Sequence, residues 1–182
     1  KVDGLAFSAT YEHGELVRVL TRGNGISGDD VTSVARAIRS LPMRLAARAS
    51  DGTANAIPEL IELRGEVYVG WAEFARLNRE REAAGDEPAV HPRNLAAGLL
   101  KQLAPEETEL LALDVVFYNW GACEPAGVAP GSQRAFHDQA RRWGLPVIDH
   151  VRGANSAATL WAAVQEIGSA RRTLAYPIDG AV

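Results

Sequence analysis

Two hydrophobic patterns divide the chain into strands and helices. Alternating apolar and polar residues, or short apolar runs between turn signals, predict β-strands at 1–11, 16–21, 60–69, 113–120, 147–151 and 178–182. Apolar residues at three- and four-residue steps predict helices at 29–38, 71–84, 92–103, 132–143 and 156–167. This mixture predicts an α+β fold in which mainly antiparallel strands bound a groove and the helices lie outside.

The boundaries of these elements carry their own signals. His13-Gly14 is a turn signal between the first two strands, which predicts a β-hairpin. Gly85 ends the second helix, and the segments 44–57 and 121–131 are predicted to be loops. Residues suited to cap or begin a helix stand at the other predicted starts: Asp29 or Asp30, Pro92, Ser132 and Ser156.

Composition limits the class of protein. The net charge of −4 argues against wrapping nucleic acid through the overall field, although local basic patches stay compatible with it. The single cysteine, Cys123, excludes an internal disulfide and a cysteine-rich zinc site, which favours a reducing cytoplasm. No window is apolar enough for a membrane span, and no signal sequence is visible. The length suits one domain, which we expect to be incomplete at both ends because it runs from Lys1, without Met, to the apolar Val182.

The first residues offer a nucleophile. Lys1 and Asp3 precede an apolar alternating run, and an amine can attack an electrophile once it is neutral. Neighbouring cations and partial burial would lower the pKa of Lys1, and Asp3 is near enough to orient the ammonium or a metal ion. The alternative is a solvated ion pair between the two side chains.

A glycine-rich stretch at 21–30 follows the hairpin. Its glycines allow backbone N–H groups to approach a phosphate or a base, and Arg22 offers a bidentate donor. A plain loop with a surface arginine is the alternative. Glu66 lies inside an apolar strand, where a carboxylate is costly without a partner, and Asp179 is the one acid of the last predicted strand. For Glu66 the alternative is the solvent face of the sheet.

The helix that begins at Pro92 carries two cations on one face, because Arg93 and Lys101 are two four-residue steps apart. That face suits phosphate groups, and a solvated surface is the alternative. His91 is a ligand or base candidate, although an ordinary loop histidine fits as well. Tyr118 near the end of a strand can stack on a base or pack in the core.

Four short motifs stand in order along the chain: Lys1-Val2-Asp3-Gly4, Thr21-Arg22-Gly23-Asn24-Gly25, Leu63-Arg64-Gly65-Glu66-Val67 and Ile178-Asp179-Gly180-Ala181-Val182. The helix that opens His91-Pro92-Arg93-Asn94 lies between the last two. From end to end this series resembles the nucleotidyltransferase (adenylation) domain of bacterial NAD-dependent DNA ligases. ATP-dependent ligases and mRNA capping enzymes share the first, third and fourth motifs, whereas the Pro-Arg-Asn helix favours the NAD-dependent branch.

The resemblance implies an ATP-grasp-like core and a reaction. Lys1 would take AMP from NAD and release nicotinamide mononucleotide, and AMP would pass to the 5′-phosphate of nicked double-stranded DNA before the strand is sealed. The implied roles are as follows: Asp3 orients Lys1 or assists the metal, Glu66 binds the ribose, Glu66 and Asp179 support Mg²⁺, Arg22 and Arg93 hold phosphates, Tyr118 and Val182 enclose adenine, and Arg93 and Lys101 contact DNA. The implied protein is a monomer.

The sequence also departs from the family pattern. The family usually has Asn at His91, Asp at Asn24, Arg at Lys101 and Val at Ala181. A lysine replaces a bidentate contact with a point charge, so these changes affect the DNA contacts more than the nucleotide chemistry. Two alternatives are a ligase-like module that binds nucleotide or DNA without catalysis and an ATP-dependent relative. We expect this stretch alone to be inactive, because the resemblance places further nucleotide-binding parts outside it.

Overall fold

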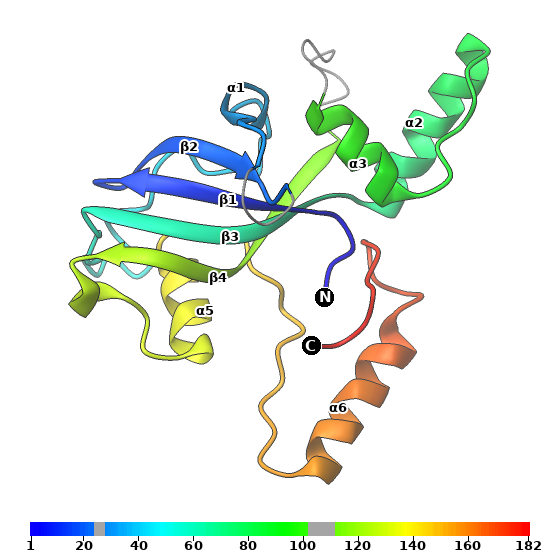
Figure 1. Cartoon of the computed structure of the whole chain (residues 1–182). Coiled ribbons are helices and arrows are strands. Elements are labelled where there is room, and N and C mark those ends of the chain that lie inside the picture. Colours follow the sequence, from blue (N-terminus) through cyan, green and yellow to red (C-terminus); the bar gives the residue numbers. More distant parts are fainter. Residues whose placement is uncertain (24–27, 102–111) are drawn as a thin grey trace.

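The computed structural model describes residues 1–23, 28–101 and 112–182. Within these residues four strands form one antiparallel sheet in the order β2-β1-β3-β4 (Figure 1). The strands are β1 (Leu5–Glu12), β2 (Glu15–Thr21), β3 (Leu60–Val69) and β4 (Leu113–Glu124). The predicted α+β class and its antiparallel pairing are confirmed.

The predicted hairpin joins β1 to β2. His13 and Gly14 both have positive φ, 48° and 82°, which matches the twist of a two-residue hairpin turn. The strands pair on either side of that turn, with Glu12 opposite Glu15. Glycine tolerates this conformation without a steric penalty, which explains why the turn falls at Gly14.

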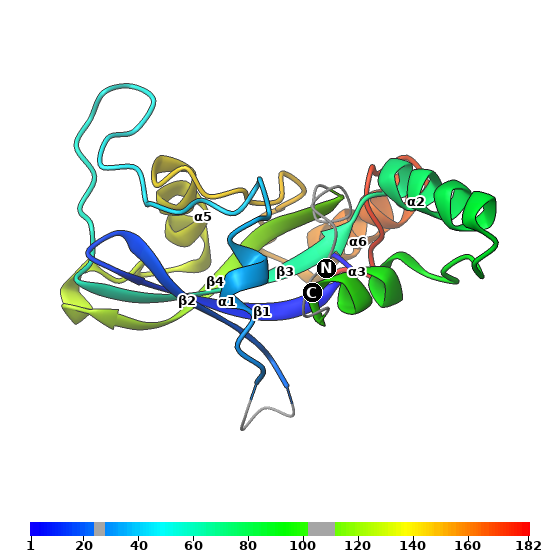
Figure 2. The same ribbon diagram turned by 90° about the horizontal axis from the view of Figure 1, so that it is seen from above.

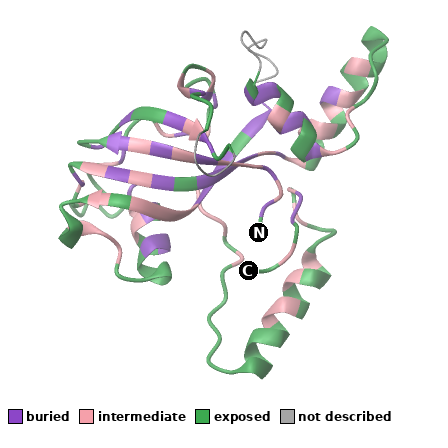
Figure 3. Ribbon diagram, viewed as in Figure 1, coloured by how far each residue is buried: buried purple, intermediate pink, exposed green. Residues whose placement is uncertain are grey.

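The core lies on one face of the sheet, and burial alternates along β1 and along β3 as far as Gly65, after which Glu66 is buried as well (Figure 3). Phe7 and Phe117 meet edge to face with their ring centroids 5.3 Å apart, on either side of Gly65 in β3. A Cβ at Gly65 would lie 2.6 Å from the Phe7 ring and 2.5 Å from the Val116 carbonyl oxygen. The Phe7 ring and the Val116 carbonyl therefore require glycine immediately before Glu66.

The helices of the described residues are α1 (Thr32–Ala35), α2 (Trp71–Ala84), α3 (Pro92–Lys101), α5 (Gln133–Arg142) and α6 (Ala157–Ala170), with a 3₁₀ turn, η1, at Ala126–Val128. Helices α1 and α5 lie against one face of the sheet, and α2, α3 and α6 gather near one end of it (Figure 2). Helix α3 packs against β3, and α5 packs against β4. None of the helices in the described part of the chain is long and apolar enough to cross a membrane.

Most predicted helix boundaries are confirmed. The second helix spans the predicted residues, and Gly85 takes the left-handed conformation at its end, with φ of 83°. Ser132 and Ser156 accept hydrogen bonds from the backbone N–H groups of Ala135 and Thr159, as N-caps do. Residues 102 and 103 of the predicted third helix lie outside the described residues.

The predicted helix at 29–38 is wrong in extent, because α1 is a single four-residue turn. The Asp30 carboxylate does accept a hydrogen bond from the Thr32 backbone N–H, at 3.0 Å. Ile38 still packs in the core without being helical. The apolar spacing therefore correctly indicated which residues are buried, but not that they are helical. The hydrogen bond of the Asp30 side chain stabilises a local turn instead of a longer helix.

The strand predictions need four corrections. Strand β1 begins at Leu5, so Lys1 precedes it, and β4 continues through residues 121–124 of the predicted loop. Residues 147–151 form only an isolated bridge between Val147 and Phe117, and residues 178–182 only one between Ile178 and Val2. Short apolar runs predict burial, and a strand also needs a neighbour along its whole length.

The two ends of the chain run side by side (Figure 1). The Asp3 N–H donates to the Pro177 carbonyl at 2.9 Å, and the Asp179 N–H donates to the Lys1 carbonyl at 3.0 Å. These bonds fix the first motif against the last one. They bring Lys1 and Asp179 together although neither residue lies in a regular strand.

Candidate nucleotide site

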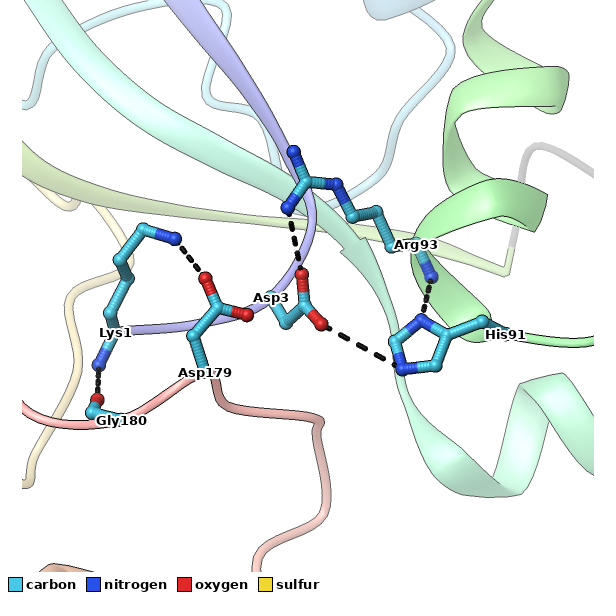
Figure 4. A network of polar contacts seen from close by, with 6 residues as sticks. All are labelled: Lys1, Asp3, His91, Arg93, Asp179 and Gly180. Carbon is cyan, nitrogen blue, oxygen red and sulfur yellow. Dashed lines mark hydrogen bonds and ion pairs between the residues drawn. The ribbon is translucent and has the colours of Figure 1, made fainter.

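Lys1 and Asp179 form the ion pair at the centre of the site (Figure 4). The Lys1 ammonium donates a hydrogen bond to the Asp179 carboxylate. That bond raises the pKa of Lys1 and lowers the pKa of Asp179, because each charge stabilises the other. The prediction of a lowered lysine pKa is wrong here, since the nearby positive charge of Arg93 is outweighed by Asp179.

Asp3 lies beside this pair, and its side chain is only 15% exposed. Arg93 donates to one carboxylate oxygen, with Nη1 3.2 Å from Oδ1. His91 faces the other oxygen, with Nε2 3.7 Å from Oδ2 (Figure 4). Asp3 is thus held by Arg93 of α3 and faces His91, which precedes that helix. The ion pair between Asp3 and Lys1 that the sequence left as an alternative is not formed within the described residues.

Glu66 is a buried acid on β3, 5% exposed. Burial raises its pKa, because a carboxylate loses solvation inside the protein. The positive charges of Lys1 and Arg93 act in the opposite direction. Glu66 shares its face of β3 with exposed Arg64 but is itself buried, so the alternative of a solvated acid is wrong. Its carboxylate is close enough to interact with the charge of the Lys1 ammonium.

One cavity of about 570 Å³ joins the predicted nucleotide residues. Lys1, Glu66, Tyr118 and Val182 all line it, and Tyr118 is held by the Gln133 amide, which donates to its backbone carbonyl. Asp179 is not among the residues that line the cavity, but its carboxylate binds the Lys1 ammonium, which does line it. Three apolar residues of α6, Leu160, Val164 and Ile167, close the far side.

The sequence analysis did not predict five polar residues that line this cavity: Asn119, Gln133, His137, His150 and Arg152. Gln133 and His137 come from α5, which contains none of the motifs singled out in the sequence. His137 is 6% exposed, its Nδ1 has no hydrogen-bond partner within the described residues, and burial lowers its pKa. The sequence did contain one indication of this position. His137 follows Phe136 on the apolar side of the predicted helix, and a buried histidine is unusual enough to suggest a role.

A second cavity of about 250 Å³ shares Lys1, Glu66 and Tyr118 with the first, and three cations besides Lys1 line it. They are Arg22, Arg93 and Lys101. The predicted common face of Arg93 and Lys101 is confirmed, because both line this space. Lys101 Nζ also lies 4.0 Å from a carboxylate oxygen of Asp29. Asn24 lies outside the described residues.

No cluster of three or more His, Cys, Asp or Glu side chains suited to a metal occurs in the part of the chain that the structure describes. Mg²⁺ does not need such a cluster, because it usually binds through one or two carboxylates together with water and substrate phosphates. The carboxylates of Asp179 and Glu66, both close to Lys1, supply that donor type.

Comparison with known proteins agrees with this geometry. The sequence profile of the NAD-dependent DNA ligase adenylation domain matches residues 1–182. All of the chain aligns with DNA ligase 1 of Opitutus terrae at 50% identity, the DNA ligase of Azorhizobium caulinodans at 44% and that of Ectopseudomonas mendocina at 38%.

The chain spans about a quarter of the length of these relatives, 26%, 24% and 22% respectively. On the profile match and these identities, the chain belongs to the NAD-dependent DNA ligase adenylation domain family.

Proposed function

We propose that this chain is the self-adenylation centre of an NAD-dependent DNA ligase and that Lys1 is its nucleophile. The observation that carries the proposal is the shared cavity, in which Lys1 and Glu66 lie together with Tyr118 and Val182. A nucleophilic amine, a buried carboxylate and an aromatic ring in one space suit a phosphate, a ribose and a purine respectively.

In the first step the neutral amine of Lys1 attacks the adenylyl phosphorus of NAD. A nitrogen–phosphorus bond forms, the phosphoanhydride bond breaks, and nicotinamide mononucleotide leaves with the bonding electron pair. The lysine proton is lost to solvent or to a neighbouring carboxylate. Glu66 accepts hydrogen bonds from the ribose hydroxyls, and Tyr118 stacks on adenine opposite Val182. Asp3 orients Lys1.

Lys1 must lose its proton before it can attack, and the Asp179 contact opposes that loss because it raises the lysine pKa. Asp179 therefore has two roles. It holds the lysine side chain in place before reaction, and its carboxylate is available to Mg²⁺ with Glu66 as the second protein ligand. The ion would supply positive charge to the phosphoryl oxygens as negative charge develops on them.

In the later steps AMP passes from Lys1 to the 5′-phosphate at a nick in double-stranded DNA, and the 3′-hydroxyl displaces it. Arg22 holds phosphates next to Lys1, and Arg93 and Lys101 contact the DNA backbone from α3. The three cations around the second cavity support this role, because phosphate oxygens are recognised by charge-assisted hydrogen bonds. The ligase acts as a monomer in the bacterial cytoplasm.

The test uses the full-length ligase that carries this chain, incubated with NAD and Mg²⁺ and analysed by intact mass. One AMP adduct that is absent from a Lys1→Arg variant is the expected result. An adduct formed with ATP but not with NAD would point to the ATP-dependent relatives instead. Binding of NAD without any adduct would leave a nucleotide-binding module and contradict the proposal.

A further inference from the structure

His91 occupies the N-cap of α3, a place that the proposed reaction does not use. Its carbonyl accepts hydrogen bonds from the N–H groups of Asn94 and Leu95, at 3.1 and 3.2 Å. Its ring Nδ1 accepts the backbone N–H of Arg93 at 3.2 Å, and the other ring nitrogen faces Asp3 (Figure 4). The ring thus connects the start of a helix to a carboxylate beside the nucleophile.

The hydrogen bond at Nδ1 determines the form of the imidazole. A backbone N–H can only donate, so Nδ1 must offer its lone pair and cannot carry a hydrogen. In the neutral ring the hydrogen then lies on Nε2, the nitrogen that is 3.7 Å from Asp3. His91 therefore presents a donor to the carboxylate and cannot take a proton from it at that nitrogen.

Asp3 is consequently held from both sides. Arg93 donates to Oδ1, and the Nε2–H group of His91 faces Oδ2. The Asp3 backbone is fixed as well, through its N–H to Pro177. One carboxylate oxygen is hydrogen-bonded, the other has the His91 ring at 3.7 Å, and the backbone is bound, so the short side chain has little freedom to rotate. Asp3 also contacts the Asp179 carboxylate, which binds Lys1, so the direction of Asp3 affects the position of Lys1.

We propose that His91 is a positioning residue: through its Nε2–H group it fixes the Asp3 carboxylate between itself and Arg93, and so keeps Lys1 aligned for attack. The expected effect of His91 on the reaction rate rests on the proposed function. The tautomer of the ring and the arrangement around Asp3 are independent of that function.

Three substitutions separate this role from helix capping, measured as single-turnover formation of lysyl-AMP in the full-length ligase. Asn, Asp and Ser all cap helices well, so His91→Asn, His91→Asp and His91→Ser should melt at similar temperatures. Only Asn keeps an amide N–H donor, which lies on the side of Asp3 when its amide oxygen accepts the Arg93 N–H. Asp presents a like charge instead, and Ser presents neither an amide donor nor a charge.

We expect His91→Asn to react within about threefold of the wild-type rate constant, and the Asp and Ser variants to be slower by on the order of 10- to 100-fold, the range for a misaligned reacting group. The NAD concentration at half-maximal rate should stay unchanged in the Ser variant, because alignment affects the chemical step. Equal rates for the Asn and Ser variants would overturn the proposal and leave His91 as a cap.

A second measurement does not depend on activity. Long-range ¹⁵N–¹H correlation spectra of the His91 ring should show Nδ1 without hydrogen and Nε2 with it. A hydrogen on Nδ1 would overturn the inference whatever the rates are. A wild-type ligase that shows the expected tautomer but forms no lysyl-AMP would contradict the proposed function and leave the arrangement around Asp3 standing.

Discussion

Replacing Glu66 by glutamine changes one buried carboxylate and almost no volume. The side chain is 5% exposed, so solvent cannot substitute for the contacts that it makes with a bound ligand. Glutamine keeps one carbonyl acceptor and removes the negative charge. The change therefore tests whether the charge of Glu66 is what the nucleotide site uses.

The magnitude follows from the burial. Hydrogen bonds to a charged group contribute about 1.5–3 kcal/mol each, and every 1.4 kcal/mol is about a tenfold change in affinity. If Glu66 holds the ribose hydroxyls, Glu66→Gln should weaken NAD binding by roughly 10- to 150-fold. Fold stability should change by less than about 1 kcal/mol, because burial already raises the pKa of Glu66 and the lost attraction to Lys1 offsets the relief.

The assay pairs calorimetric titration of NAD with the single-turnover rate of lysyl-AMP formation, both in the full-length ligase. Glu62→Gln is the matched control, because Glu62 lies on the same face of β3, is more exposed and pairs with Arg64 instead of lining a cavity. Thermal unfolding of both variants checks the fold. NAD binding and adenylation within about twofold of wild type in Glu66→Gln would refute the role given to Glu66.

Three further changes test other parts of the account. Gly65→Ala should lose at least about 1–3 kcal/mol of stability, measured by urea unfolding, because its Cβ would overlap Phe7 and the Val116 carbonyl; an unchanged midpoint would contradict the packing. Arg93→Ala should lower the salt slope of nick binding by about one, whereas exposed Arg79→Ala on α2 should not; equal slopes would remove Arg93 from the DNA contact. Burial lowers the pKa of His137, so the folded state binds a proton there less readily than the unfolded state does, and stability should fall as pH drops below about 6.5. His137→Leu should reduce that loss of stability at low pH. The same pH profile in the variant and the wild type would count against buried His137 as its source.

The sequence predicted the elements that have a strong period and a clear end. The helix at 71–84 and the hairpin at His13-Gly14 follow directly from apolar spacing, a terminal glycine and turn chemistry. The ends of the chain were harder, because Lys1 and Asp179 are brought together by two backbone hydrogen bonds and one bridge, not by a strand. No local pattern encodes a contact between the first and last residues.

Some features of the candidate site could be predicted from the sequence, and others only from the structure. Lys1, Glu66 and Tyr118 could be named from motifs, and they share a cavity. The raised pKa of Lys1 could not be foreseen, since it depends on which of several nearby charges makes the hydrogen bond. His91 also needed the structure, because the Arg93 N–H that fixes its ring is a feature of the backbone and leaves no trace in the sequence.

Locating the residue that receives AMP shows whether Lys1 is the nucleophile. The full-length ligase is incubated with NAD and Mg²⁺, digested, and the adduct is located by peptide mass spectrometry, with Lys1→Arg as the matched variant. We expect a phosphoramidate on the Lys1 side chain and none in the variant. An adduct on another residue, or an adduct that persists in Lys1→Arg, would contradict it.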